Sequence, residues 1–62
     1  MFNAFTYDPD FAEHTEAVEV TDVADAVYRL GAFDNDIFIT EHDVIVAVLV
    51  YKGYGEFDAL SV

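Results

Sequence analysis

The run Val44 to Tyr51 is the feature that most constrains how this chain can fold, because all of its side chains are apolar or aromatic. Its eight residues are far fewer than the roughly twenty that a membrane-spanning helix needs. We therefore predict a strand that is covered on both faces. One cover is the helix predicted over residues 22–30. The other is the C-terminal segment with Tyr54, Phe57 and Leu60, or a second copy of the protein.

Short strand-like runs separated by turn signals make up much of the remaining chain. We predict strands over residues 2–7, 16–20 and 37–41, with residues 9–14 forming a turn or a single helical turn. His42-Asp43 is a two-residue connection between the strand 37–41 and the apolar run. Residues 52–55 end that run with a turn, and the last seven residues are too few for a stable independent element.

The helix predicted over residues 22–30 has a signal at each end. Thr21 is the expected N-cap, because its hydroxyl can accept a hydrogen bond from a free backbone amide, and Gly31 suits a left-handed C-terminal cap. Val23, Val27 and Leu30 recur at helical spacing, and we expect them to pack against the hairpin of residues 37–51. The predicted fold is α+β: a small antiparallel sheet of three to four strands with one main α-helix packed on one face.

Length and composition place the chain among small folded domains. Sixty-two residues suffice for a single domain, residues 1–62, and the ten aromatic residues (six Phe and four Tyr) exceed what a disordered acidic tail contains. The sequence has no cysteine and its N-terminal residues lack the pattern of a signal peptide, so we expect a soluble protein of a reducing cytoplasm.

A strong excess of negative charge limits the partners that this chain can have. Thirteen carboxylates against Arg29 and Lys52 give a formal net charge of −11. Such a charge repels nucleic acids and anionic membranes and attracts basic protein surfaces. We therefore expect a basic protein partner, with no direct binding of nucleic acid and no membrane contact. Solubility or adaptation to high salt is the alternative explanation of the same acidity.

Residues that support catalysis or metal binding are few. A cysteine nucleophile is absent, the only serine is Ser61 near the end of the chain, and the two imidazoles, His14 and His42, lie beside acidic neighbours. Asp34, Asp36 and Glu41 loosely match a calcium loop, but Phe38 and Ile39 stand where a ligand and a glycine are needed. We expect no catalytic residue, no metal ligand and no cofactor, with a small metal-binding protein as the weakest alternative.

Carboxylates recur at every third residue from position 10 to position 25. No single helix or strand keeps that period on one face, so the groups should emerge as a band across several elements. Charges two apart on a strand lie about 6.6 Å from each other, a length scale comparable with the phosphates of DNA. The predicted partner-binding residues are a first band, Glu13, Glu16, Glu19, Asp22 and Asp25, and a second group at two turns, Asp34, Asp36, Glu41 and Asp43.

The chain resembles the small, acidic, phage-encoded anti-CRISPR inhibitors that act as DNA mimics. The resemblance rests on its size, its scarcity of Lys and Arg, and the segment Val18 to Val27, in which a strand leads into a capped helix. It implies docking on the DNA-binding channel of a type I surveillance complex, with subtype I-C as one option, in the cytoplasm of the host. The alternative is a salt-adapted or self-associating interaction module without mimicry, and a homodimer is compatible with either function.

Overall fold

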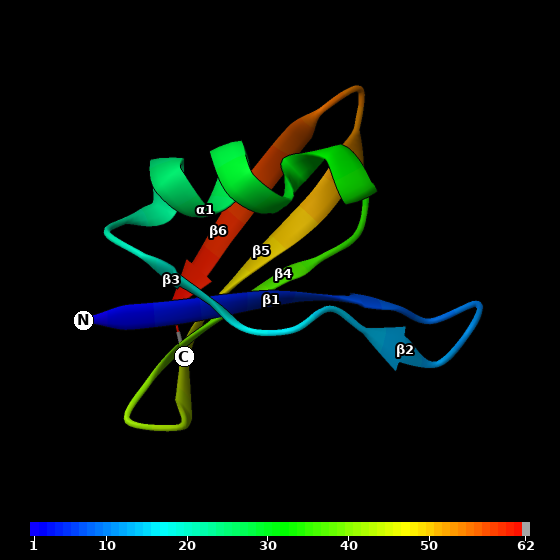
Figure 1. The fold of residues 1–62 in the computed structure, drawn as a ribbon. Helices are drawn as coiled ribbons and strands as arrows, with labels where there is room; N and C mark the ends of the chain where they lie inside the picture. The colour runs from blue at the N-terminus through cyan, green and yellow to red at the C-terminus, as the bar shows by residue number, and fades with distance from the viewer. Residues whose placement is uncertain (62) are drawn as a thin grey trace.

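In the computed structural model, which describes residues 1–61, a single antiparallel sheet carries one short helix on one side (Figure 1). The strands are β1 (Phe2–Asp8), β2 (Glu13–His14), β3 (Val18–Val20), β4 (Ile37–Glu41), β5 (Val44–Gly53) and β6 (Glu56–Ser61). The helix α1 (Val23–Leu30) continues into the 3₁₀ turn η1 (Gly31–Phe33). The predicted α+β class is confirmed, although the sheet has six strands where three to four were expected.

The sheet follows the order β2-β1-β4-β5-β6, and β3 pairs with β1 on the same side as β2. Each pair is antiparallel, so β1 lies between the short strands β2 and β3 on one side and β4 on the other. The predicted strand 16–20 is shorter than expected, because its pairing with β1 involves only Val18 to Val20. Residues 9–12 form the predicted turn, and β2 follows it.

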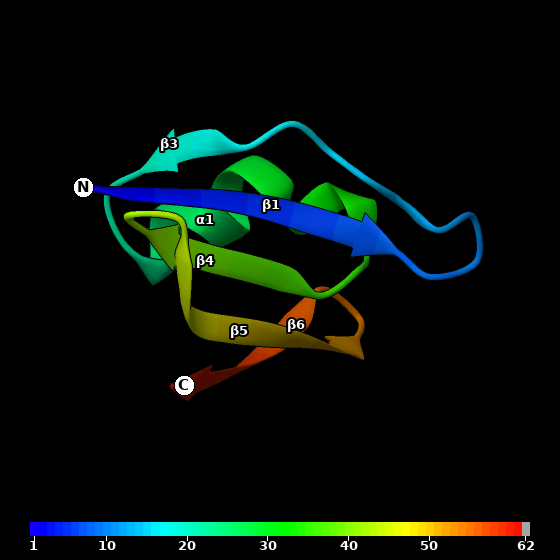
Figure 2. The same ribbon diagram turned by 90° about the horizontal axis from the view of Figure 1, so that it is seen from below.

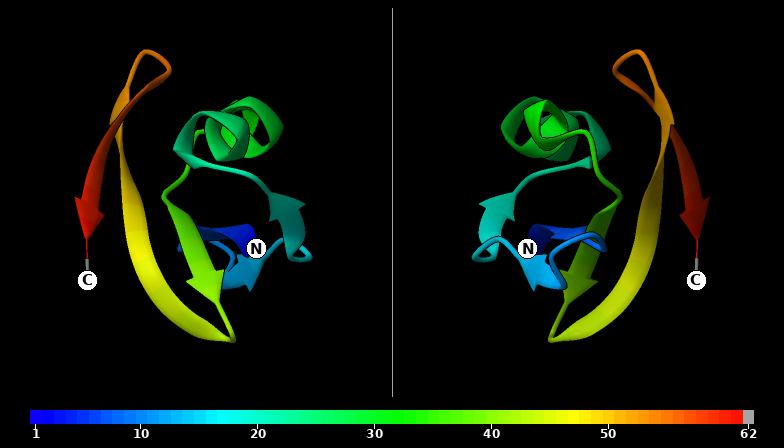
Figure 3. Two further views of the ribbon diagram at one scale, coloured as in Figure 1. Left: turned by 90° about the vertical axis from the view of Figure 1, so that its left-hand side faces the viewer. Right: turned by 90° about the vertical axis from the view of Figure 1, so that its right-hand side faces the viewer.

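The C-terminal residues form β6, which was not predicted. β6 pairs with β5 from Gly53–Glu56 to Ala47–Ser61, so its hydrogen bonds come from a neighbour and a short segment needs no stability of its own. It therefore lies beside β5 and does not cover it, as Figure 1 shows, and Figure 2 shows β1, β4 and β5 in their order in the sheet. The C-terminal segment is therefore not the second cover of β5: α1 lies on one side of the sheet, and within residues 1–61 no element lies over the other (Figure 3). The alternative, that a second copy covers this side, stays a prediction.

We call this uncovered side of the sheet the open face. Ile37 and Leu49 are fully buried beneath α1, and side chains alternate between the two sides of a strand. Their neighbours Phe38 and Val48 therefore point to the open face. Both are only half-buried, so the open face is apolar but not enclosed.

The helix begins one residue later than predicted and ends at Leu30 as predicted, but both of its caps differ from the prediction. Asp22, not Thr21, is the N-cap, because its carboxylate accepts the backbone N–H of Asp25 at 2.8 Å. Gly31 is right-handed (φ −62°) and continues into η1, and the left-handed residue is Asp34 (φ 56°). A Cβ atom at Gly31 would lie 3.4 Å from Val27 and 3.6 Å from the ring of Phe57 on β6, which are ordinary van der Waals distances.

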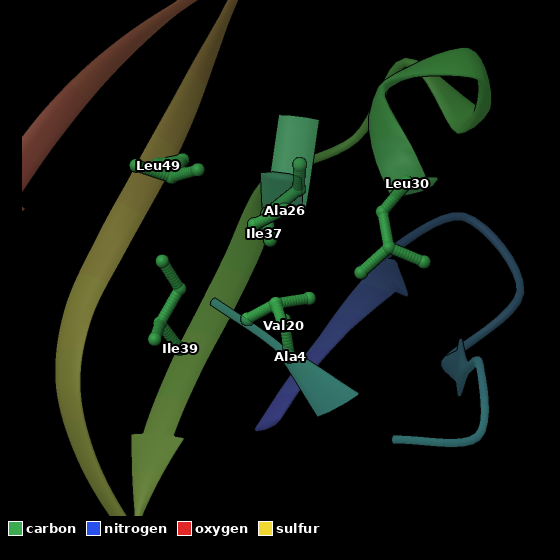
Figure 4. Packing of buried hydrophobic residues seen from close by; sticks show 7 residues of the cluster. All are labelled: Ala4, Val20, Ala26, Leu30, Ile37, Ile39 and Leu49. Atoms are coloured by element: carbon green, nitrogen blue, oxygen red, sulfur yellow. The ribbon is translucent and has the colours of Figure 1, made fainter. Parts of the chain in front are cut away.

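The core lies between α1 and the sheet. Seven apolar side chains are buried there, and Figure 4 shows them pointing toward one another: Ala4, Val20, Ala26, Leu30, Ile37, Ile39 and Leu49. Leu30 is 4% exposed, as the helical spacing predicted. Val23 is 43% exposed, so its predicted burial is wrong, and Ala26 takes the central position instead. The helix packs on β1, β3 and β4.

Both hairpins close with two residues in the left-handed region. His42 and Asp43 have φ values of 53° and 63°, and Tyr54 and Gly55 have 56° and 74°. Such turns match the right-handed twist of the strands that they connect. The predicted His42-Asp43 connection is confirmed.

Candidate partner-binding surface

Part of the predicted first band follows one edge of the sheet. Glu13 lies in β2, Glu16 in the link between β2 and β3, and Glu19 in β3, so all three lie on the side of β1 away from β4. Asp22 continues the series at the start of α1. All four residues are exposed. We call Glu13, Glu16, Glu19 and Asp22 the acidic edge.

Asp25 belongs to the predicted band, but its carboxylate is hydrogen-bonded to other residues of the same fold. Its carboxylate accepts the backbone N–H of Thr21 at 2.9 Å and the Nε–H of Arg29 at 3.0 Å. The hydrogen bond from Thr21 is the main cause that lowers the pKa of Asp25 below its ordinary value of 3.8, and Arg29 adds to it. Asp25 is half-buried, so it holds the first turn of α1 and offers little charge to a partner.

The predicted second group does not form one surface. Asp34 and Asp36 precede β4, whereas Glu41 ends β4 and Asp43 follows in the hairpin turn. The length of β4, about 16 Å at 3.3 Å per residue, therefore separates the two pairs. They lie at opposite ends of the sheet and not in a continuous band.

Asp36 also makes hydrogen bonds within the fold. Its Oδ1 accepts the backbone N–H of Tyr51 at 2.8 Å, and its carbonyl oxygen accepts the hydroxyl of Thr6 at 2.8 Å. Thr6 is the buried polar residue of the core region. Asp36 thus joins β1, β4 and β5 at one end of the sheet.

The two cationic side chains are already paired, so they do little to offset the negative surface elsewhere. Arg29 binds Asp25, and Lys52 lies 3.6 Å from the carboxylate of Asp58. The N-terminal ammonium lies 3.9 Å from Glu41. These pairs are separate from Glu13, Glu16 and Glu19, whose charges are therefore not neutralised by a paired cation within residues 1–61. A basic surface that approached the acidic edge would meet the free carboxylates of Glu13, Glu16 and Glu19, whereas the carboxylate of Asp22 caps α1.

A second candidate surface lies on the open face, of which the sequence predicted only the part on the run Val44 to Tyr51, as a strand face covered by a second copy. On the open face, the rings of Phe5 and Phe38 stack with centroids 5.4 Å apart, Phe38 is opposite Val48, and Val48 is opposite Leu60. We call Phe5, Phe38, Val48 and Leu60 the apolar row. It crosses β1, β4, β5 and β6, and His14 extends it with an edge-on contact to Phe5 at 5.7 Å. The only sequence signal for it is the alternation with buried neighbours in each strand.

The side chains considered for metal binding are not gathered at one place in the described part of the chain. Within residues 1–61, no group of three or more His, Asp or Glu side chains is placed to hold a metal ion. His14 packs on Phe5, and His42 lies in the β4–β5 turn, so the two imidazoles serve different local structures. Among the same residues, no helix combines the length and apolarity needed to cross a membrane.

The comparisons with known proteins found no match, so the surface geometry is the only evidence that bears on function. No protein-family model, no curated protein and no solved structure matches this chain.

Proposed function

We propose that this protein is an inhibitor that occupies the basic DNA-binding surface of a nucleic-acid-handling protein by mimicking DNA. The observation that carries the proposal is the acidic edge, a series of exposed carboxylates without paired cations on a chain of net charge −11. The most specific target is a type I CRISPR surveillance complex in the host cytoplasm, which the resemblance to acidic anti-CRISPR inhibitors suggests. On this proposal the protein is not an enzyme.

The dimensions of the acidic edge support mimicry. From Glu13 to Glu19 the chain advances six residues, which span at most about 20 Å when extended. Phosphates along one DNA strand repeat every 3.4 Å, so this length corresponds to roughly six phosphates. The acidic edge carries fewer charges than DNA over that length, and the total charge of the protein adds long-range attraction.

The fold holds the acidic edge in a fixed geometry. β3 is anchored by Val20, which is buried in the core, and Glu19 lies opposite Asn3 on β1. The link before β3 is held by Thr15, whose backbone N–H donates to the carbonyl of Thr6 at 2.9 Å. A preorganised charged surface loses less conformational entropy on binding than a flexible acidic tail would.

Competition with DNA is the experiment that tests the proposal. A purified type I-C surveillance complex is incubated with labelled target duplex and increasing amounts of the protein, and the bound duplex is measured by mobility shift. We expect the protein to displace the duplex, and to do so less well as salt rises, because the attraction between exposed charges is screened. Binding to the complex without displacement of DNA would exclude mimicry.

A matched pair of variants distinguishes local recognition from total charge. Glu16→Gln with Glu19→Gln removes two charges from the acidic edge, whereas Asp43→Asn with Glu56→Gln removes two charges at the hairpin tips. Asparagine is well tolerated at the left-handed Asp43, so the control should fold normally. We expect the first variant to lose much more inhibition than the second. Equal losses would mean that net charge alone attracts the partner.

A further inference from the structure

We infer that the open face is a self-association surface, on which the apolar row of one copy packs against the apolar row of a second copy. The inference does not rest on the proposed inhibitory function, because it concerns the opposite side of the sheet from α1, where Glu19 at the rim is the member of the acidic edge that faces this side. It is carried by the geometry of the apolar row and by the distribution of charge around it.

The apolar row is continuous across four strands. Phe5 stacks on Phe38, and the register then sets Phe38 beside Val48 and Val48 beside Leu60. Leu60 on the edge strand is 55% exposed, and Phe5, Phe38 and Val48 are each half-buried. Cross-strand neighbours of this kind form one surface, since their Cβ atoms lie about 4.5 to 5.5 Å apart. A partner that covers the row would remove all four side chains from water together.

Neighbouring side chains widen the apolar surface on both sides of the row. Ile45 is 40% exposed and lies opposite Thr40, and Tyr7 is 37% exposed and lies opposite His14. Val50, two residues after Val48 on β5, faces the same side. Apolar residues therefore occupy the centre of the open face, both along the strands and across them.

Charge distribution favours a second copy over a basic partner at this position. By strand alternation, the carboxylates on this side of the sheet are Glu19, Asp36, Glu56 and Asp58, and each lies at its rim. Asp58 is paired with Lys52, and Asp36 is hydrogen-bonded to Tyr51. The uncharged middle offers nothing to attract a basic surface. The uncharged centre of the open face is instead complementary to another uncharged apolar surface, and the same face of a second copy is such a surface.

The size of the face is compatible with a dimer. The Cα trace measures 27 × 22 × 20 Å, so the projection of any one face is at most on the order of 600 Å². The accessible surface of a face is larger than its projection, and stable interfaces bury roughly 800 Å² per partner. The single copy has a core of seven buried apolar residues, two of them alanine, and small domains commonly gain stability by oligomerisation.

The test measures oligomeric state as a function of salt. Sedimentation equilibrium is recorded over a range of protein concentrations at roughly 0.01 M and roughly 1 M NaCl, between which the Debye length falls from about 30 Å to about 3 Å. Two chains of net charge −11 repel each other, so we expect dimerisation to strengthen at high salt. Binding of the acidic edge to a basic partner would weaken over the same range, so the two interactions are distinguishable by the sign of their salt dependence.

Two variants matched in charge and exposure locate the interface. Leu60→Lys places a cation at the end of the apolar row, and Val44→Lys places one at a residue that is 61% exposed in the hairpin outside the row. Both lower the net negative charge equally, which by itself favours dimerisation. We expect Leu60→Lys to weaken the dimer by at least about ten-fold, close to the loss of one large apolar contact, and Val44→Lys to leave it intact.

A third variant, Val48→Thr, nearly keeps the shape of the side chain and so distinguishes a weaker interface from a misfolded protein. It should also weaken the dimer while thermal unfolding by circular dichroism remains cooperative. The inference is overturned if the protein is monomeric at both salt concentrations, if salt dissociates the dimer, or if Leu60→Lys and Val44→Lys associate equally.

Discussion

Asp36, in the loop before β4, accepts a hydrogen bond of 2.8 Å from the backbone amide of Tyr51 near the end of β5. This contact links residues fifteen positions apart and satisfies a half-buried amide next to the β5–β6 turn. The carboxylate therefore acts within the fold, although the sequence placed it among the candidate partner-binding residues.

Replacing Asp36 should reduce stability. Asp36→Ala leaves the Tyr51 amide without its acceptor, and an unsatisfied, partly buried donor costs about 1 to 3 kcal/mol in the free energy of unfolding. Asp36→Asn keeps an acceptor oxygen and should lose less. Urea unfolding followed by circular dichroism measures both, with the exposed Glu16→Ala as a control that should change little. If Asp36→Ala were as stable as the control, the hydrogen bond would contribute nothing.

Leu30 should be among the most sensitive positions of the helix. Leu30→Ala removes a side chain that is 4% exposed, and such truncations cost about 2 to 5 kcal/mol, a large part of the stability of a small domain. Val23→Ala, at a residue that is 43% exposed, should cost less than about 1 kcal/mol. The comparison is made by chemical denaturation, and equal losses at the two positions would contradict the observed orientation of α1.

The pH dependence of stability should include a contribution from Asp25. The hydrogen bond from Thr21 and the contact with Arg29 lower the pKa of Asp25 in the folded protein below its ordinary value of 3.8. The unfolded chain therefore binds the proton more readily, so the stabilisation is complete above the ordinary pKa and is lost as pH falls through the folded value.

The variant Asp25→Asn isolates this contribution from the other carboxylates. At neutral pH it should unfold at a lower denaturant concentration than the parent protein, and the difference between the two should shrink as pH falls below 3.8. A difference that stayed constant across this range would show that the charge of Asp25 does not stabilise the folded state.

Tyr54 should be a site at which stability can be gained. It is fully exposed and has a left-handed backbone (φ 56°), a conformation unfavourable for a tyrosine, in the turn between β5 and β6. Tyr54→Asn produces the Asn-Gly pair favoured in such turns, and we expect a gain of about 0.5 to 1 kcal/mol. Thermal unfolding measures it, and a decrease in the melting temperature would indicate that the exposed ring makes contacts that the structure does not contain.

Local sequence determined the identity and position of most elements. The turn residues His42-Asp43 and the apolar runs on either side predict the β4–β5 hairpin, because strand alternation and turn conformation depend on neighbouring residues. The spacing of Val23, Val27 and Leu30 likewise predicts α1, although Val23 is exposed. Its start was shifted by one residue, because Thr21 and Asp22 both have side chains suited to capping and only the complete geometry selects Asp22.

Tertiary structure decided which residues are free to act. β6 exists because β5 offers it hydrogen-bonding partners, and the apolar row exists because the register aligns residues from four strands. The charge of the chain follows from its sequence, but the carboxylates of Asp25 and Asp36 are engaged by amides, whereas Glu16 and Glu19 remain exposed. Strand register determines β6, the apolar row and the contact of Asp36, whereas Asp25 is engaged locally, by Thr21 and Arg29 four residues away on either side.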